Sequence, residues 1–203
     1  WGATLTIVQN MTQLGVNTTA DATNKLAVAS AAILFTNIGN DCQVKVNKAA
    51  TGNKAGFLFQ NNFSARAEFG LLGDDNFTLK VSADGSTFFD ALKMLAANGR
   101  VALKSNAAGL SGAGTTQVTA TAITKQTNEF TTVAASSGAI LPSPEQGEFI
   151  FVANAGANAL NIYPAIGHTI NALGVNAAFP LAAGKNCMFW AATASKWYSI
   201  LTA

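Results

Sequence analysis

Acidic side chains in the middle of the chain are the first candidates for chemistry: Glu68, Asp74, Asp75, Asp84 and Asp90. An enzyme that cleaves a glycosidic bond needs two carboxyl groups roughly 5–10 Å apart, one protonated and one ionised. Asp74 and Asp75 are neighbours in a predicted turn, where their side chains tend to diverge, and Asp84 precedes Gly85 as turn chemistry requires. Turn formation accounts for these three acids, so we assign no catalytic residue and do not expect an enzyme.

Ion-binding roles are also weakly supported by the sequence. The loop at residues 73–76 offers oxygen ligands, but it lacks the ligand spacing of an EF-hand. Glu68 follows Arg66 by two residues, so in a strand both lie on one face, and an ion pair between them or across to a neighbouring strand is expected. Zinc-ligand spacing, a phosphate-binding glycine loop and a serine-nucleophile motif do not occur. We therefore expect neither a metal nor a cofactor.

Aromatic and amide side chains near the C-terminus suit a different ligand, an uncharged saccharide. A sugar offers C–H faces to aromatic rings and hydroxyl groups to amides. We predict that glycan is bound by five residues in or near turns: Tyr163, His168, Tyr198, Asn154 and Asn158. The only histidine, His168, lies 20 residues from the nearest carboxylate in sequence, which favours a structural or glycan-contact role over catalysis. Trp190 and Trp197 are expected in the core, and a core position remains the alternative for both tyrosines.

The elements that must position these side chains begin with residues 53–103. Short apolar runs alternate there with turns such as Asp84-Gly85 and Asn98-Gly99, dipeptides typical of type I′ hairpins because such turns need positive φ. Within residues 77–81 the apolar side chains alternate with Thr and Lys, which predicts a strand with one buried face. The stretch is predicted to be an antiparallel sheet, although residues 87–95 also fit helical spacing.

Residues before this sheet carry weaker signals. Residues 5–8 fit a strand, and residues 25–35 are ambiguous between helix and strand, with strand favoured. In the alternating run 43–47, Val44 and Val46 are expected to point inward. Residues 1–105 are therefore interpreted as one β domain, a β-sandwich-like connecting or shoulder domain.

The region after residue 105 predicts a linker and a second domain. Residues 106–124 consist mostly of Gly, Ala, Ser and Thr without a charge, which is typical of a linker, although 118–123 could start the next sheet. Residues 125–203 contain short strand patterns that predict a jelly-roll-like β-sandwich: 129–133, 148–153, 160–163, 168–170, 187–191 and 197–201. The predicted fold class is all-β, built from antiparallel-sheet and β-sandwich modules.

Charge excludes several partners and favours another copy of the chain. Only 11% of residues are charged, against about 25% in ordinary domains, and the net charge is +2. Without a Lys/Arg cluster or a run of about 20 apolar residues, neither nucleic-acid binding nor membrane insertion is expected. Beyond Glu148 the only charged residues are Lys185 and Lys196. Such sparse charge predicts a surface buried against identical copies.

The two cysteines and the start of the chain complete these expectations. Cys42 and Cys187 fit no metal-binding or redox spacing, and we expect two buried thiols, with a disulfide as the alternative. The chain starts at Trp1 without Met or a basic signal region, so it is interpreted as part of a longer protein.

Six short segments give the N-terminal half a family resemblance: NTTADATNKLAV, VNKAATG, GFLFQ, FSARAEFG, GDDNFTLKVSADGSTFFDAL and GRVAL. Over about 90 residues they resemble a module of tail-fibre or host-specificity proteins from tailed phages, prophages and gene transfer agents of alphaproteobacteria. The sequence departs from that pattern at Ala65, where Gly is usual, and at Asn76, where Asp is usual. The segments FIFVANAGANALNIYPAIGHTIN and PLAAGKNCMFWAATASKWYSI are similar to a second module, which occurs at the ends of phage fibre and virion proteins.

These resemblances imply a trimeric fibre that contacts a host surface. We accordingly expect a homotrimer that belongs to a virion fibre or spike, contacts other virion proteins and attaches to host envelope polysaccharide through residues 125–203. Several weak sites on one rigid trimer would bind by avidity. Two alternatives stay open: a structural virion component without a receptor, such as a head fibre, collar or baseplate decoration, and a polysaccharide depolymerase.

Overall fold

The computed structural model describes residues 10–202 and is all-β, with 45% strand and 2% helix. Its contacts divide the chain into two compact units, with the division between Lys45 and Val46. The predicted strand at residues 5–8 lies outside the described residues. In the first unit, β1 (Leu14–Val16) and β2 (Leu26–Val28) form a short parallel pair. Strand β2 covers only the beginning of the segment 25–35.

The predicted strand at 43–47 is wrong. Neither Val44 nor Val46 belongs to a strand, and both side chains are exposed. Alternation of two valines over five residues indicates a strand only if a neighbouring strand is available to pair with it, and the structure provides none there. The boundary between the two compact units falls in this segment.

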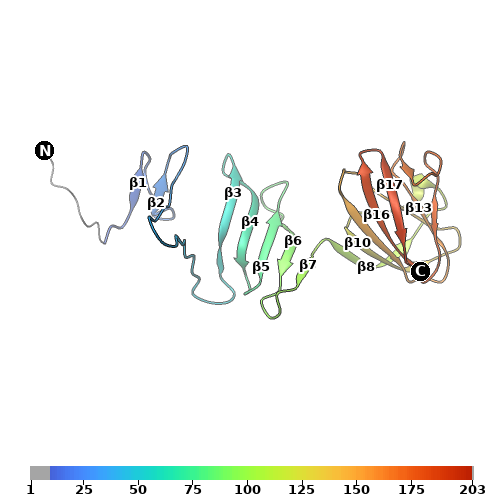
Figure 1. The fold of residues 1–203 in the computed structure, drawn as a ribbon, viewed down its shortest axis with the longest axis horizontal. Helices are drawn as coiled ribbons and strands as arrows, with labels where there is room; N and C mark the ends of the chain where they lie inside the picture. Colours follow the sequence, from blue (N-terminus) through green and yellow to red (C-terminus); the bar gives the residue numbers. More distant parts are fainter. Residues whose placement is uncertain (1–9, 203) are drawn as a thin grey trace. The chain divides into compact units, whose positions relative to one another are not determined.

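The second unit begins with a five-stranded antiparallel sheet in which each strand pairs with the next (Figure 1). Its strands are β3 (Lys54–Asn61), β4 (Ser64–Leu72), β5 (Phe77–Val81), β6 (Phe89–Met94) and β7 (Val101–Leu103). The antiparallel sheet predicted over 53–103 is therefore confirmed, and the ambiguous segment 87–95 is a strand. The helical spacing is overridden because β6 pairs on both sides.

The turn chemistry differs from the expectation. Gly85 and Gly99 have positive φ, but the preceding Asp84 and Asn98 do not, so neither turn is type I′. The turn with two consecutive positive φ values is Asn62-Phe63, at 48° and 62°, which joins β3 to β4. Asn tolerates this conformation, whereas a bulky side chain such as Phe63 rarely adopts it, so the sequence indicated a break after Phe59 but not the conformation of this turn.

The two faces of this sheet differ in chemistry. We call one of them the apolar face; its exposed side chains are Phe57, Phe59, Phe77, Leu79, Val81, Phe89, Met94, Val101 and Leu103. The opposite face carries Glu68, Lys80, Asp90 and Lys93. The alternation predicted for 77–81 is present, but its apolar side is exposed and Thr78 is buried. Among the described residues of the second unit, no further layer of strands covers the apolar face, although the Lys125 ammonium group lies 5.3 Å from the centroid of the Phe89 ring.

The rest of the unit is a two-layer β-sandwich. One sheet has six strands in the order β14-β17-β16-β12-β10-β8, and the other has four in the order β15-β13-β11-β9. The strands are β8 (Asn106–Gly112), β9 (Thr121–Ala122), β10 (Thr127–Val133), β11 (Gly138–Ile140), β12 (Phe149–Asn154), β13 (Leu160–Tyr163), β14 (Thr169–Ile170), β15 (Phe179–Leu181), β16 (Asn186–Thr193) and β17 (Lys196–Leu201). A 3-10 turn, η1 (Gln117–Thr119), precedes β9.

The connections of the sandwich are not those of a jelly roll. From β8 to β13 the chain alternates between the two sheets, so that β8, β10 and β12 pair in parallel in one sheet and β9, β11 and β13 pair in parallel in the other. Strands β15 and β16 then pair antiparallel with β13 and β12. A jelly roll has antiparallel neighbours throughout, whereas this domain is a coil of three parallel turns completed by antiparallel strands.

The predicted linker at 106–124 contributes to this coil. Its residues form β8, η1 and β9, and β8 pairs with β10 along its length. Small residues suit this segment because other side chains pack closely against its backbone; a Cβ on Gly112 would collide with the side chains of Leu160 and Ser137. The buried core lies between the two sheets and includes Ile123, Phe130, Leu141, Ile150, Leu160, Ile162, Phe189 and Trp197.

Candidate functional site

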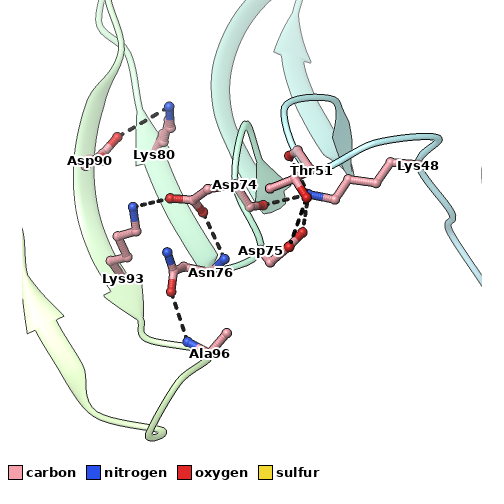
Figure 2. Close-up of polar contacts among 9 residues, drawn as sticks. All are labelled: Lys48, Thr51, Asp74, Asp75, Asn76, Lys80, Asp90, Lys93 and Ala96. Atoms are coloured by element: carbon pink, nitrogen blue, oxygen red, sulfur yellow. Dashed lines mark hydrogen bonds and ion pairs between the residues drawn. The ribbon is translucent and has the colours of Figure 1, made fainter.

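The acidic turn between β4 and β5 is held in place by two lysines (Figure 2). Lys48 donates hydrogen bonds to the carbonyl oxygens of Thr51 at 2.8 Å and Asp74 at 2.7 Å, and it pairs with the Asp75 carboxylate at 2.8 Å. The Asp74 carboxylate pairs with Lys93 on β6 and accepts a hydrogen bond from the backbone N–H of Asn76 at 2.8 Å. These contacts fasten the turn to the edge of the sheet.

The same contacts make the turn unsuited to acid catalysis. The hydrogen bond from Lys93, together with those from Asn76, lowers the pKa of Asp74 to about 2, and Lys48 lowers the pKa of Asp75. Backbone N–H groups of Thr87 and Ser86, at 2.7 and 2.8 Å, lower the pKa of Asp84. A general acid needs its pKa raised, whereas these three carboxyl groups are held ionised. Their role in the structure is to stabilise turns.

The remaining acids of the sheet pair across strands. Glu68 is buried, and its two carboxylate oxygens accept hydrogen bonds of 2.9 and 3.1 Å from the ammonium group of Lys54, which lies on the neighbouring strand β3. Asp90 pairs with Lys80 at 3.4 Å. The expectation of an ion pair across to a neighbouring strand is confirmed for Glu68, with Lys54 as its partner, while Arg66 donates to the carbonyl oxygen of Ala83 at 2.8 Å.

Two of the predicted glycan ligands, Asn154 and Asn158, are brought together by the fold, and the amide groups of both donate hydrogen bonds to the backbone. The buried Asn154 amide donates to the carbonyl oxygens of Asn158 at 2.9 Å and Leu181 at 2.8 Å, and its oxygen accepts from Gly156 N–H. The Asn158 amide donates to the carbonyl oxygen of Val133 at 2.8 Å. The buried Asn154 amide therefore has no group left for a sugar.

The other three predicted ligands do not share a groove. Tyr163 lies on the outer face of the four-stranded sheet and donates from its hydroxyl to Thr115 O at 3.2 Å. Tyr198 lies on the outer face of the six-stranded sheet, because its neighbour Trp197 points into the core. His168 lies in the turn before β14, with its Nδ1 3.0 Å from the carbonyl oxygen of Ile166. The sandwich core separates the two tyrosines.

The six-stranded sheet instead presents a continuous aromatic surface, which we call the outer aromatic face. It consists of two rows of side chains across β12, β16 and β17: Phe149, Trp190 and Tyr198 in one, and Phe151, Met188 and Ile200 in the other. Trp190 and Tyr198 are each 41% exposed, and their ring centroids are 6.2 Å apart. The Lys196 ammonium group lies 5.0 Å from the Tyr198 ring.

A hollow of about 630 Å³ lies at one end of this face. Its floor includes Phe151, Met188 and Ile200, and its polar side chains come from Asn106, Thr127, Glu129, Asn186 and Thr202. An apolar floor with a few polar groups around it is the usual composition of a small-ligand site. The adjoining row of Phe149, Trp190 and Tyr198 extends the apolar surface beyond the hollow.

Trp190 was misassigned to the core, whereas the core position of Trp197 is confirmed. Trp197 is fully buried and its indole N–H donates to Pro142 O at 3.3 Å. The signal that distinguishes the two is strand alternation: Cys187, Phe189 and Ala191 are buried, so Trp190 must point outward. Hydrophobicity alone assigned both residues to the interior.

Other predicted features of the chain have definite positions. Cys42 and Cys187 are both free thiols; Cys187 is buried as expected, and burial raises its pKa to about 11, but Cys42 is exposed. Among residues 10–202, no three His, Cys, Asp or Glu side chains gather as a metal site would require. Within the same described range, no helix has the length and apolar character to span a bilayer.

Comparison with known proteins adds no relative: no family model, no curated protein and no solved structure matches this chain. The resemblance of its short segments to phage fibre modules therefore remains a prediction.

Proposed function

We propose that this chain is part of a virion fibre or spike that assembles as a homotrimer and attaches to host envelope polysaccharide through the outer aromatic face. The observation that supports this proposal best is the outward pair of Trp190 and Tyr198 beside a hollow with an apolar floor and a polar rim. In this proposal the protein lies on the virion outside the host cell, next to other virion proteins.

The chemistry of the face suits a sugar. Aromatic rings stack on the C–H faces of a pyranose, while amide, hydroxyl and carboxylate groups such as those of Asn106, Thr127 and Glu129 hydrogen-bond to its hydroxyls. The rings lie on three neighbouring strands, so the sheet fixes their spacing before a ligand binds. The proposed mechanism is adhesion without catalysis, in which identical weak sites on one assembly add up to firm attachment.

The test is binding of the protein to a glycan array and to polysaccharide purified from candidate host envelopes. We expect Trp190→Ala to weaken binding about 3- to 10-fold per site, the effect of losing one aromatic contact. The matched control is Tyr163→Ala, which removes an aromatic side chain from the outer face of the opposite sheet and should bind like the wild type. Absence of binding to any envelope, or equal loss in the two variants, contradicts the adhesion proposal.

A structural role in the virion is the second candidate, and one observation favours it. The six side chains of the outer aromatic face are apolar apart from the indole N–H and the phenol, so the face also suits burial against another virion protein or another copy. The same variant separates the two roles. In a structural role Trp190→Ala changes the mass of the assembly, whereas in a receptor role it changes binding and leaves the mass unchanged.

A further inference from the structure

We infer that the apolar face of the five-stranded sheet β3–β7 is buried against the same face of other copies of this chain. This identifies the surface that holds the assembly together, and it rests on the proposed homotrimer only for the number of copies. The face is separate from the outer aromatic face of the sandwich, because the two belong to different sheets.

The apolar face is continuous across all five strands. Directly opposed residues form a row of Phe57, Phe69, Leu79, Leu92 and Leu103. The Phe69 ring lies 5.4 Å from Phe57, 5.6 Å from Phe59 and 5.9 Å from Phe77, measured between centroids. These contacts order the side chains within one sheet, yet most of the face remains open to solvent.

Charge is segregated to the opposite face. The ion pairs Lys54–Glu68 and Lys80–Asp90 and the Lys93–Asp74 contact all lie on that side or at its edge. The polar face is therefore complete without a partner, and Thr78 and Glu68 are already buried on it. The strands contribute no charged or hydrogen-bonding side chain to the apolar face, and one charged group lies near it, the Lys125 ammonium group 5.3 Å from the Phe89 ring. A face of this composition has little with which to select a foreign partner, so an identical face is its natural complement.

The exposed area matches what a stable interface needs. The nine exposed side chains of the face present about 800 Å² of apolar surface, if each has a full area of roughly 200 Å². A stable protein interface buries about 800 Å² per partner, whereas the largest apolar patch of a monomer is about 300–600 Å². A sheet with one apolar face needs a second layer to bury it, and the unit of residues 46–202 supplies none.

The experiment compares two leucine-to-lysine substitutions in the 203-residue chain. Leu79, at the centre of the apolar face, is 36% exposed, and Leu58, on the opposite face beside Glu68, is 52% exposed. In sedimentation equilibrium, the wild type and Leu58→Lys should form assemblies of the same mass, a multiple of the 20.8 kDa mass of one chain. Leu79→Lys should give 20.8 kDa, because an unpaired ammonium group cannot be buried between the copies.

Folding of the variants is checked by circular dichroism. If Leu79→Lys loses its β signal, Val101→Lys replaces it, since Val101 lies on the same face but is 59% exposed on the edge strand β7. A folded variant of the apolar face that keeps the wild-type mass overturns the inference and leaves glycan attachment intact. If the wild type is a monomer, both the inference and the homotrimer are wrong. If the wild type is a dimer that Leu79→Lys dissociates, the interface is supported but the number of three copies is contradicted.

Discussion

Asp74 owes its charge state to Lys93 and to Asn76, and this makes the stability of its turn depend on pH. Its folded pKa of about 2 lies below the ordinary value of 3.8, so the carboxylate stabilises the fold fully above about pH 4. That stabilisation is lost as the pH falls from about 4 to about 2, where the folded state also takes up the proton. The turn is thus predicted to weaken in acid.

The prediction is tested with Asp74→Asn. The variant should have a lower unfolding midpoint than the wild type at pH 7, and the difference should shrink as the pH is lowered from 4 to 2, because the wild type then loses its charge as well. Thermal unfolding followed at several pH values measures both. A difference that stays constant down to pH 2 would show that Asp74 contributes by packing and not by charge.

Single residues also show where sequence reasoning succeeds and fails. The structural role of the turn acids was predictable, because Asp before Gly and neighbouring acids in a polar loop follow local turn chemistry. The role of Asn154 was not, since its partners Asn158 and Leu181 come together only when two strands meet. Likewise, Tyr163 and Tyr198 are equivalent in sequence, and only the assignment of each strand to a sheet places them on opposite sides of the core.

At the level of elements, strand positions were easier to predict than strand neighbours. The segment 160–163 coincides with β13, and the whole of β3–β7 was expected to be an antiparallel sheet. Alternation reveals which side chains share a face, but it does not reveal which strand lies alongside. The parallel pairing of β8, β10 and β12 was therefore missed, as were the short strands β11 and β15, which offer too few residues for a periodic signal.

Gly70, which lies opposite Gly56, is one of two glycines on which the close pairing of β3 with β4 depends. Its φ is +141°, and a Cβ there would overlap the backbone of Ala55 and Gly56 on β3. We predict that Gly70→Ala destabilises the sheet by about 1–3 kcal/mol, from backbone strain and the lost close approach. Gly52→Ala, at a position with open space and an ordinary φ, is the control and should change the free energy of unfolding by less than about 0.5 kcal/mol. Urea unfolding of both variants measures the difference in the free energy of unfolding. If the two variants are equally stable, the strands can move apart at Gly70 without lowering the stability of the sheet.

At the scale of the whole molecule, the contacts place the boundary of the compact units between Lys45 and Val46, and composition placed a boundary near residue 105. Composition misled because Gly, Ala, Ser and Thr are typical of linkers, yet small residues also suit strands whose backbones approach closely. In the structure this segment forms an edge strand of each sheet of the sandwich. It also contributes Ile123 to the buried core, with Leu110 packed against that core.

The two boundaries predict different outcomes for two fragments. The free energy of unfolding of residues 46–203 should lie within about 0.5 kcal/mol of that of the 203-residue chain, because the unit retains all its strands. The fragment should also form assemblies with the same number of copies, because it retains the apolar face. Residues 125–203 should be unstable, because the fragment loses β8, β9 and Ile123 and leaves β10 and β11 as unpaired edges. Urea unfolding and sedimentation of the purified fragments measure both properties. If the fragment 125–203 is as stable as the fragment 46–203, the segment 106–124 acts as a linker after all. The parallel pairing of β8 with β10 would then contribute nothing to the stability of the sandwich.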